Sequence, residues 1–152
     1  MEIQLIRSND SLFAESLTKK NMASYYKTRN LVWDRDKFLN SWDDLDNYEV
    51  LADNIRVGVI RFSYDENKIY LRDFQLTPEC QGKGIGSKCL DLLANQASSQ
   101  QYNRMVLRVF SENPAVKLYE SKGFIRTSEI KGLIEMELDL TRRNHANITR
   151  NC

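Results

Sequence analysis

Apolar and polar residues alternate along much of the first half of the chain, and this period of two is typical of strands. The alternation predicts four strands, over residues 2–7, 48–53, 55–65 and 68–78. The last three follow one another through short turns rich in Asp and Asn, which predicts a meander of antiparallel strands.

Between the first and second strands, apolar residues recur three or four positions apart, which predicts two amphipathic helices. The first runs from Leu12 through Tyr26. The second begins after Asp34, whose carboxylate is a suitable N-cap, and Trp33 is placed to pack against Phe38 across that cap.

The second half of the chain alternates between the two periods. It predicts a helix over 85–97, a strand over 104–110, a short helix with Asn113 as its cap and Pro114 at its first position, and strands over 124–130 and 133–140. This order predicts an α/β fold with a mixed sheet and helices on both faces. We expect one domain over residues 1–140 and a polar tail over 141–152.

The composition is that of an ordinary globular domain, with 41% hydrophobic and 28% charged residues and a net charge of +1. This charge balance indicates no nucleic-acid partner, and no apolar run approaches the length of a membrane span. Three cysteines without a CxxC pair indicate a reducing compartment, so we expect a cytoplasmic protein. The lone His145 offers neither a metal site nor a catalytic triad, and no metal is expected.

Three glycines alternate in the segment CQGKGIGSKCL, at positions 82, 84 and 86. A Walker A loop requires G-x-x-x-x-G-K-[ST], and here the Lys and Ser stand in the reverse order. A Rossmann loop requires G-x-G-x-x-G after the first strand of a βαβ unit, which this spacing does not match. The remaining pattern, Q-x-x-G-x-G before a helix, can bind a pyrophosphate through backbone N–H groups. The structural alternative is a tight turn that uses glycine for packing.

A second segment, NPAVKLYESKGF at 113–124, follows the next predicted strand. Together with LTPECQGKGIGSKCL at 76–90, it closely resembles the two signature segments of the GNAT N-acetyltransferase superfamily. The resemblance implies the GNAT acyltransferase fold, a mostly antiparallel mixed sheet that splays between its fourth and fifth strands. It also implies acetyl-CoA as the acyl donor, with no metal.

The resemblance also assigns cofactor-binding residues. The pyrophosphate would lie on the main chain of Gln81, Gly82, Lys83, Gly84, Ile85, Gly86 and Ser87. The pantetheine arm would pair with the backbone at Phe74 and Leu76 and accept a hydrogen bond from Asn113. Tyr119 would protonate the leaving thiolate as the catalytic acid. The structural alternatives are a helix cap for Asn113 and a core aromatic beside Phe124 for Tyr119.

General bases in this superfamily often lie on the strand before the glycine loop, which makes Tyr70, Arg72 and Asp73 the candidate substrate residues. Alternation along the strand suggests that Tyr70 and Arg72 share the face toward the acceptor, with Asp73 on the other face. Arg72 stays protonated and cannot be a base. If the assignment of faces is reversed, Asp73 becomes the candidate base, and Glu49 is another. The structural alternative for Arg72 is an ion pair with a neighbouring acid.

The resemblance therefore predicts an N-acetyltransferase that transfers the acetyl group of acetyl-CoA to a primary amine by direct attack in a ternary complex. The acceptor is a small molecule or a peptide, and the protein is a monomer or a homodimer. The alternative is a catalytically silent GNAT-fold module that binds coenzyme A or a protein partner.

Overall fold

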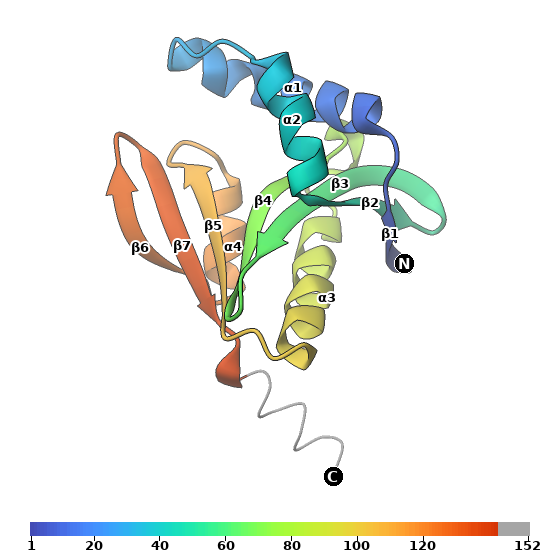
Figure 1. Cartoon of the computed structure of the whole chain (residues 1–152), viewed down its shortest axis with the longest axis vertical. Helices are drawn as coiled ribbons and strands as arrows, with labels where there is room; N and C mark the ends of the chain where they lie inside the picture. The colour runs from blue at the N-terminus through green and yellow to red at the C-terminus, as the bar shows by residue number, and fades with distance from the viewer. Residues whose placement is uncertain (143–152) are drawn as a thin grey trace. The chain divides into compact units, whose positions relative to one another are not determined.

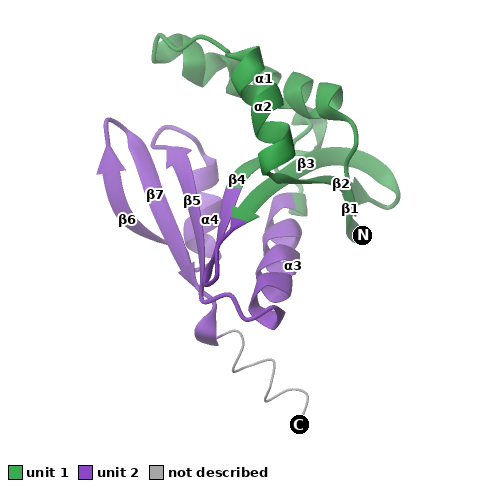
Figure 2. Ribbon diagram, in the orientation of Figure 1, with its two compact units in different colours: residues 1–63, 72–85 green, residues 64–71, 86–152 purple. Residues whose placement is uncertain are grey.

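A computed structural model describes residues 1–142 of the 152-residue chain (Figure 1). These residues form two compact units (Figure 2). Unit 1 comprises Met1–Ser63 and Arg72–Ile85, and unit 2 comprises Tyr64–Leu71 and the chain from Gly86 onward. All but the first two residues of the predicted polar tail, His145 included, lie outside the described residues. No helix within residues 1–142 is long and apolar enough to cross a membrane.

Unit 1 consists of two helices and an antiparallel sheet. Its elements are β1 (Ile3–Arg7), α1 (Ser11–Thr28), α2 (Arg35–Asp44), β2 (Asp46–Ala52), β3 (Ile55–Tyr64) up to residue 63, the second half of β4 (Lys68–Leu76), and the short 3-10 helix η1 (Pro78–Cys80). Both β1 and β3 pair antiparallel with β2. The two helices therefore interrupt an otherwise continuous run of antiparallel strands.

The core of unit 1 forms where both helices meet the sheet. Ala14 and Leu17 of α1, Phe38 of α2 and Val59 of β3 are buried together. The Asp34 carboxylate caps α2 by accepting a hydrogen bond from the Lys37 backbone N–H at 3.0 Å. The rings of Trp33 and Phe38 lie 5.6 Å apart, which confirms the predicted contact across this cap.

Unit 2 contains the first half of β4, α3 (Ile85–Ser99) from Gly86, β5 (Arg104–Phe110), α4 (Ala115–Ser121), β6 (Ile125–Ile130) and β7 (Leu133–Asp139). Residues 68–71 of β4 pair in parallel with residues 104–107 of β5. β7 pairs antiparallel with both β5 and β6. Its core includes Cys89 and Leu93 of α3 together with Met105 of β5 and Met136 of β7. A hydrogen bond of 2.9 Å from Lys122 to Asp91 links the end of α4 to α3.

The order of strands is β1-β2-β3-β4-β5-β7-β6, with β4 and β5 as the parallel pair and four flanking helices, so the predicted mixed, mostly antiparallel sheet is confirmed. The ends of the elements differ from the predicted ranges by at most two residues. The second helix ends at Asp44, because Asp46 already pairs with Phe62 in the sheet. The short helix begins at Ala115, so Asn113 precedes its first turn by two residues.

Candidate active site

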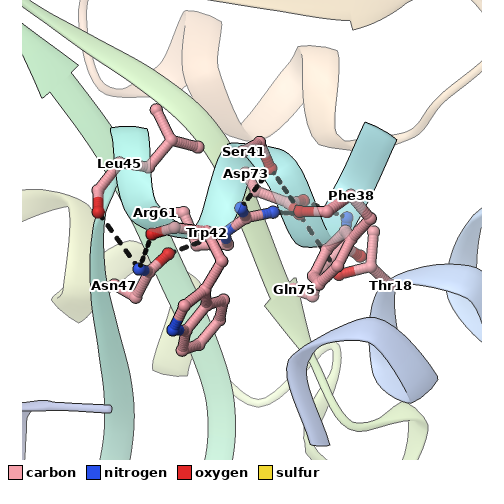
Figure 3. Close-up of polar contacts among 9 residues, drawn as sticks. All are labelled: Thr18, Phe38, Ser41, Trp42, Leu45, Asn47, Arg61, Asp73 and Gln75. Carbon is pink, nitrogen blue, oxygen red and sulfur yellow. Dashed lines mark hydrogen bonds and ion pairs between the residues drawn. The ribbon is translucent and has the colours of Figure 1, made fainter. Parts of the chain in front are cut away.

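The carboxylate of Asp73 in β4 is held by three side chains of unit 1 (Figure 3). Its Oδ2 accepts a hydrogen bond from the Thr18 hydroxyl of α1 at 3.2 Å. Its Oδ1 accepts one from the Gln75 amide at 2.8 Å. Arg61 Nη1 of β3 forms an ion pair with Oδ2 at 3.6 Å. Asp73 is therefore an ionisable group with a defined orientation on the strand where the resemblance predicts a base.

Arg61 is the centre of this network, and its side chain is only 4% exposed. Its Nε donates to Asn47 Oδ1 at 2.9 Å, and its Nη2 donates to the Ser41 hydroxyl at 2.6 Å. The guanidinium also lies over the ring of Phe38, 4.3 Å from the ring centroid. Burial of a positive charge is costly unless the charge is paired. The two hydrogen bonds, the ion pair with Asp73 and the contact with the Phe38 ring together compensate this cost.

The neighbours of Arg61 also fix the end of α2. The Asn47 amide donates to the backbone carbonyls of Trp42 at 2.7 Å and Leu45 at 3.1 Å. Carbonyls at a helix C-terminus have no partner within the helix, so Asn47 satisfies groups that would otherwise need water. The network thereby joins α2, β2, β3 and β4 within unit 1 (Figure 3).

Burial shifts the protonation of this cluster. Burial raises the pKa of Asp73 above its usual value, although the Gln75 and Thr18 hydrogen bonds and the Arg61 charge each act to lower it. Burial also lowers the pKa of Arg61, against the effect of the Asp73 charge. The pKa of Tyr26 on α1 is raised, first by burial and then by the Asp73 carboxylate. A carboxylate with a raised pKa is better matched to accepting a proton near neutral pH.

The other two predicted substrate residues contact the β3–β4 hairpin. The Tyr70 hydroxyl donates to Asp65 Oδ2 at 2.8 Å within unit 2. Arg72 is exposed, and its Nε donates to the Ser63 hydroxyl at 3.0 Å within unit 1. The structure therefore brings Asp73 to α1, as in the alternative assignment of faces. Their roles toward a substrate stay predictions.

Glu49, the other candidate base, lies in a different group of side chains. Its carboxylate accepts a hydrogen bond from the Ser8 hydroxyl at 2.9 Å and pairs with Arg56 at 3.4 Å. Arg56 also pairs with Asp10 at 2.9 Å and lies 3.7 Å from the centroid of the Phe13 ring. These contacts join the start of α1 to β2 and β3, which is a structural role.

The glycine loop presents bare main chain before α3. Gly82 and Gly84 adopt positive φ angles of 73° and 83°, and no atom lies within 4 Å of where a side chain would begin. Helix α3 begins at Ile85, so the N–H groups of its first turn have no partner within the helix. This loop fits a large anion, because only glycine combines that backbone with such close access.

One of the cofactor contacts predicted near this loop involves a carbonyl that already has protein partners. The Leu76 carbonyl accepts hydrogen bonds from the Asn21 amide at 2.9 Å and the Gln81 amide at 3.1 Å. A carbonyl oxygen has two lone pairs, so a pantetheine pairing at Leu76 would fall to its N–H. Phe74 is half-buried in the same strand.

Asn113 and Tyr119, both in unit 2, have contacts within the protein. Asn113 Oδ1 accepts a hydrogen bond from the Ala115 N–H at 2.9 Å, although the residue directly before α4 is Pro114. Tyr119 is buried, and its ring meets that of Phe124 edge to face at 5.6 Å. These contacts do not test the roles predicted for them, which stay predictions.

Arg61, Thr18, Ser41 and Asn47 were not predicted. The signal that could have found Arg61 is its place in the run VGVIRF, where a charge stands among residues typical of a strand buried on both faces. A buried charge must be paired, so this position alone indicates partners elsewhere in the chain. Within residues 1–142, no group of three or more His, Cys, Asp or Glu side chains could hold a metal ion.

Comparison with known proteins assigns the family. The sequence model described as an acetyltransferase (GNAT) domain matches residues 35–132, a stretch that includes parts of both units. A bovine thialysine N-epsilon-acetyltransferase is 35% identical over 79 residues, which are 49% of this chain and 46% of that protein. The chain thus spans about half the length of this curated relative.

Solved structures share the fold at low identity. The ribosomal-protein-S18-alanine N-acetyltransferase of Escherichia coli has a TM-score of 0.74 at 18% identity, over 91% of this chain and 94% of that one. The spermidine N-acetyltransferase of Vibrio cholerae, in complex with CoA and spermine, has a TM-score of 0.71 at 19% identity, over 91% and 96% of the two chains. With the family match, these similarities confirm the predicted recognition: the chain belongs to the GNAT acetyltransferase family, whose members are acyltransferases.

Proposed function

We propose that this protein is an acetyl-CoA-dependent N-acetyltransferase in which Asp73 accepts the proton of a primary amine acceptor. The observation that carries the proposal is the oriented Asp73 carboxylate with its raised pKa on β4. An amine with a pKa near ~10.4 is almost wholly protonated at neutral pH, so it must lose a proton before it attacks a carbonyl. A carboxylate of raised basicity supplies that acceptor.

Acetyl-CoA, when bound, supplies the acetyl group as a thioester. The main chain from Gln81 to Ser87 would hold its pyrophosphate, and the open glycine backbone supports this role. Lys83 is exposed in this loop and adds positive charge. The backbone of Phe74, the Leu76 N–H and the Asn113 side chain would bind the pantetheine arm.

Tyr119 holds a proton at its hydroxyl oxygen, which a departing thiolate can take. Its buried ring keeps that hydroxyl in a defined place, since the packing against Phe124 restricts rotation. The same packing would serve a structural residue equally well, so the proposal for Tyr119 rests on the resemblance of the segment 113–124 to the family signature.

The family match to residues 35–132 supports a single catalytic domain over residues 1–140, because it joins segments of both units. The relatives indicate the class of acceptor. Their names specify thialysine, a ribosomal-protein alanine and spermidine, each of which offers an amine. We infer that the acceptor here is also an amine, in a small molecule or at the end of a peptide.

The first test is calorimetric titration of the full chain with acetyl-CoA. Gly84→Glu should abolish binding, because the side chain blocks the loop and its carboxylate repels the anion. Gln100→Glu, which adds the same charge at an exposed position, should bind as the wild type does. Equal affinity in all three proteins, with unchanged circular dichroism, would exclude this loop as the pyrophosphate site.

The second test is thiol release from acetyl-CoA over a panel of polyamines, amino acids and peptides. Asp73→Asn should lower kcat by roughly 10²–10⁴-fold and leave acetyl-CoA affinity unchanged. Asp43→Asn changes an exposed carboxylate and is the matched control. Turnover by Asp73→Asn at the wild-type rate would refute the base assignment. Binding of acetyl-CoA without turnover on any amine would favour the silent module instead.

A further inference from the structure

We infer that Arg61 is a positioning residue whose charge, held in place by Asn47 and Ser41, controls the proton affinity of the oriented Asp73 carboxylate. The catalytic role of Arg61 rests on the proposed function. The effect of the Arg61 charge on the Asp73 carboxylate does not depend on it. Both residues belong to unit 1.

The hydrogen bonds of Arg61 go to residues other than Asp73. Nε and Nη2 donate to Asn47 and Ser41 at 2.9 and 2.6 Å, whereas the Nη1 distance to Asp73 Oδ2 is 3.6 Å. At 3.6 Å the positive charge is still felt, but the contact is too long for a strong hydrogen bond. The guanidinium is therefore anchored by other residues while it acts on Asp73 electrostatically.

Asp73 consequently keeps capacity to take a proton. A carboxylate offers about four lone-pair sites, and hydrogen bonds from Thr18 and Gln75 occupy one on each oxygen. The Asp73 side chain is 13% exposed, so it is largely buried but still in contact with solvent. The arrangement orients the carboxylate and limits its basicity without removing it.

Among residues 1–142, two titratable groups interact with Asp73 from the elements around it. β3 contributes the positive charge of Arg61, and α1 contributes the Tyr26 phenol, whose own pKa is raised. Tyr26 stays neutral at the pH at which Asp73 titrates, so Arg61 is the charge that controls the carboxylate. α2 and β2 contribute the neutral Ser41 and Asn47, which act through Arg61.

The test separates the charge of Arg61 from its shape. Arg61→Met removes the charge, so the acid limb of the kcat/KM profile should move up by about 1–3 pH units. Arg61→Lys keeps the charge but loses the planar fork, so the limb should stay near the wild-type position while kcat falls. A residue with only a structural role would lower activity at every pH and leave the limb unmoved.

A direct titration makes the result independent of turnover. Carboxyl ¹³C NMR of the full chain should show the Asp73 midpoint rising in Arg61→Met, whereas the Asp139 midpoint should stay constant and report an intact fold. If Arg61→Met does not fold, Arg61→Gln removes the charge but keeps an amide donor, and the same rise is expected. An unchanged Asp73 midpoint in whichever variant folds would overturn the inference. Failure of the proposed function would appear separately, as full activity of Asp73→Asn.

Discussion

Each unit contains an ion pair with a similar distance between the charged groups, but one pair is buried and the other is exposed to solvent. In unit 1, Arg61 and Asp73 lie 3.6 Å apart with side chains 4% and 13% exposed. In unit 2, Arg108 and Glu135 also lie 3.6 Å apart, but their side chains are 63% and 32% exposed. The same distance therefore describes a pair removed from water in one unit and a solvated pair in the other.

The energetic contribution of an ion pair therefore depends on its burial more than on the distance between the charges. A buried charge needs bonded partners, and removal of one partner leaves the other uncompensated. Solvated pairs such as Lys68 with Glu137, at 3.8 Å, are screened by salt and add little to stability. Burial raises the pKa of Asp73 and lowers the pKa of Arg61, which makes this buried pair a candidate for chemistry.

The largest expected effect comes from breaking the buried pair. Arg61→Met should lower the free energy of unfolding by about 3–5 kcal/mol, because it leaves Asp73 without its counter-charge. The double variant Arg61→Met with Asp73→Leu should recover much of this loss in urea unfolding. No recovery in the double variant would show that packing of Arg61, rather than the charge on Asp73, is what matters.

The pH dependence of stability is the next effect. The raised pKa of folded Asp73 means that the folded protein binds a proton more tightly than the unfolded chain does. This stabilisation is complete below the unfolded value of 3.8 and is lost as pH rises through the folded pKa.

Asp73→Asn should abolish that slope, which corresponds to about 1.4 kcal/mol for each pKa unit. The measurement is urea unfolding of both proteins at a series of pH values. In unit 2, Asp139 has the opposite sign: hydrogen bonds from Thr141 lower its pKa, so its contribution is lost as pH falls. A parallel pair of pH curves would contradict the prediction for Asp73.

A smaller effect is expected from removal of the Ser41 hydroxyl, which holds Arg61 in place. Ser41→Ala removes the acceptor of the 2.6 Å hydrogen bond from Nη2 and should cost about 1 kcal/mol. Ser99→Ala removes an exposed hydroxyl on α3 and serves as the matched control. An equal cost in both variants would show that burial of the anchor contributes nothing extra.

The smallest effect is expected for the solvated pair. Arg108→Gln should change the free energy of unfolding by about 0.2–1 kcal/mol, and the change should disappear in about 1 M salt. A loss of unfolding free energy as large as that of Arg61→Met would show that the buried and the solvated pair contribute equally to stability.

Much of the fold was predictable because its signals are local. The caps at Asp34, the turn at Asp53-Asn54 and the glycines before α3 each act within a few residues. The glycine loop of the candidate site was predictable for the same reason, since its chemistry lies in consecutive backbone groups. The side chain of β4 that meets α1 was not predictable in the same way, because alternation shows which residues share a face but not what covers it.

The order of elements and the family were predictable from the sequence alone, because periodicity and motifs are properties of neighbouring residues. The binding of an anion by the glycine loop was predicted from the same kind of local pattern and stays a prediction. The contacts of Asp73 with Thr18 of α1 and Arg61 of β3 became visible in the folded structure and not in the sequence. The reason is physical: burial and charge compensation depend on which distant segments pack together. The proton affinity of Asp73 is set by that packing and therefore cannot be read from the strand that carries it.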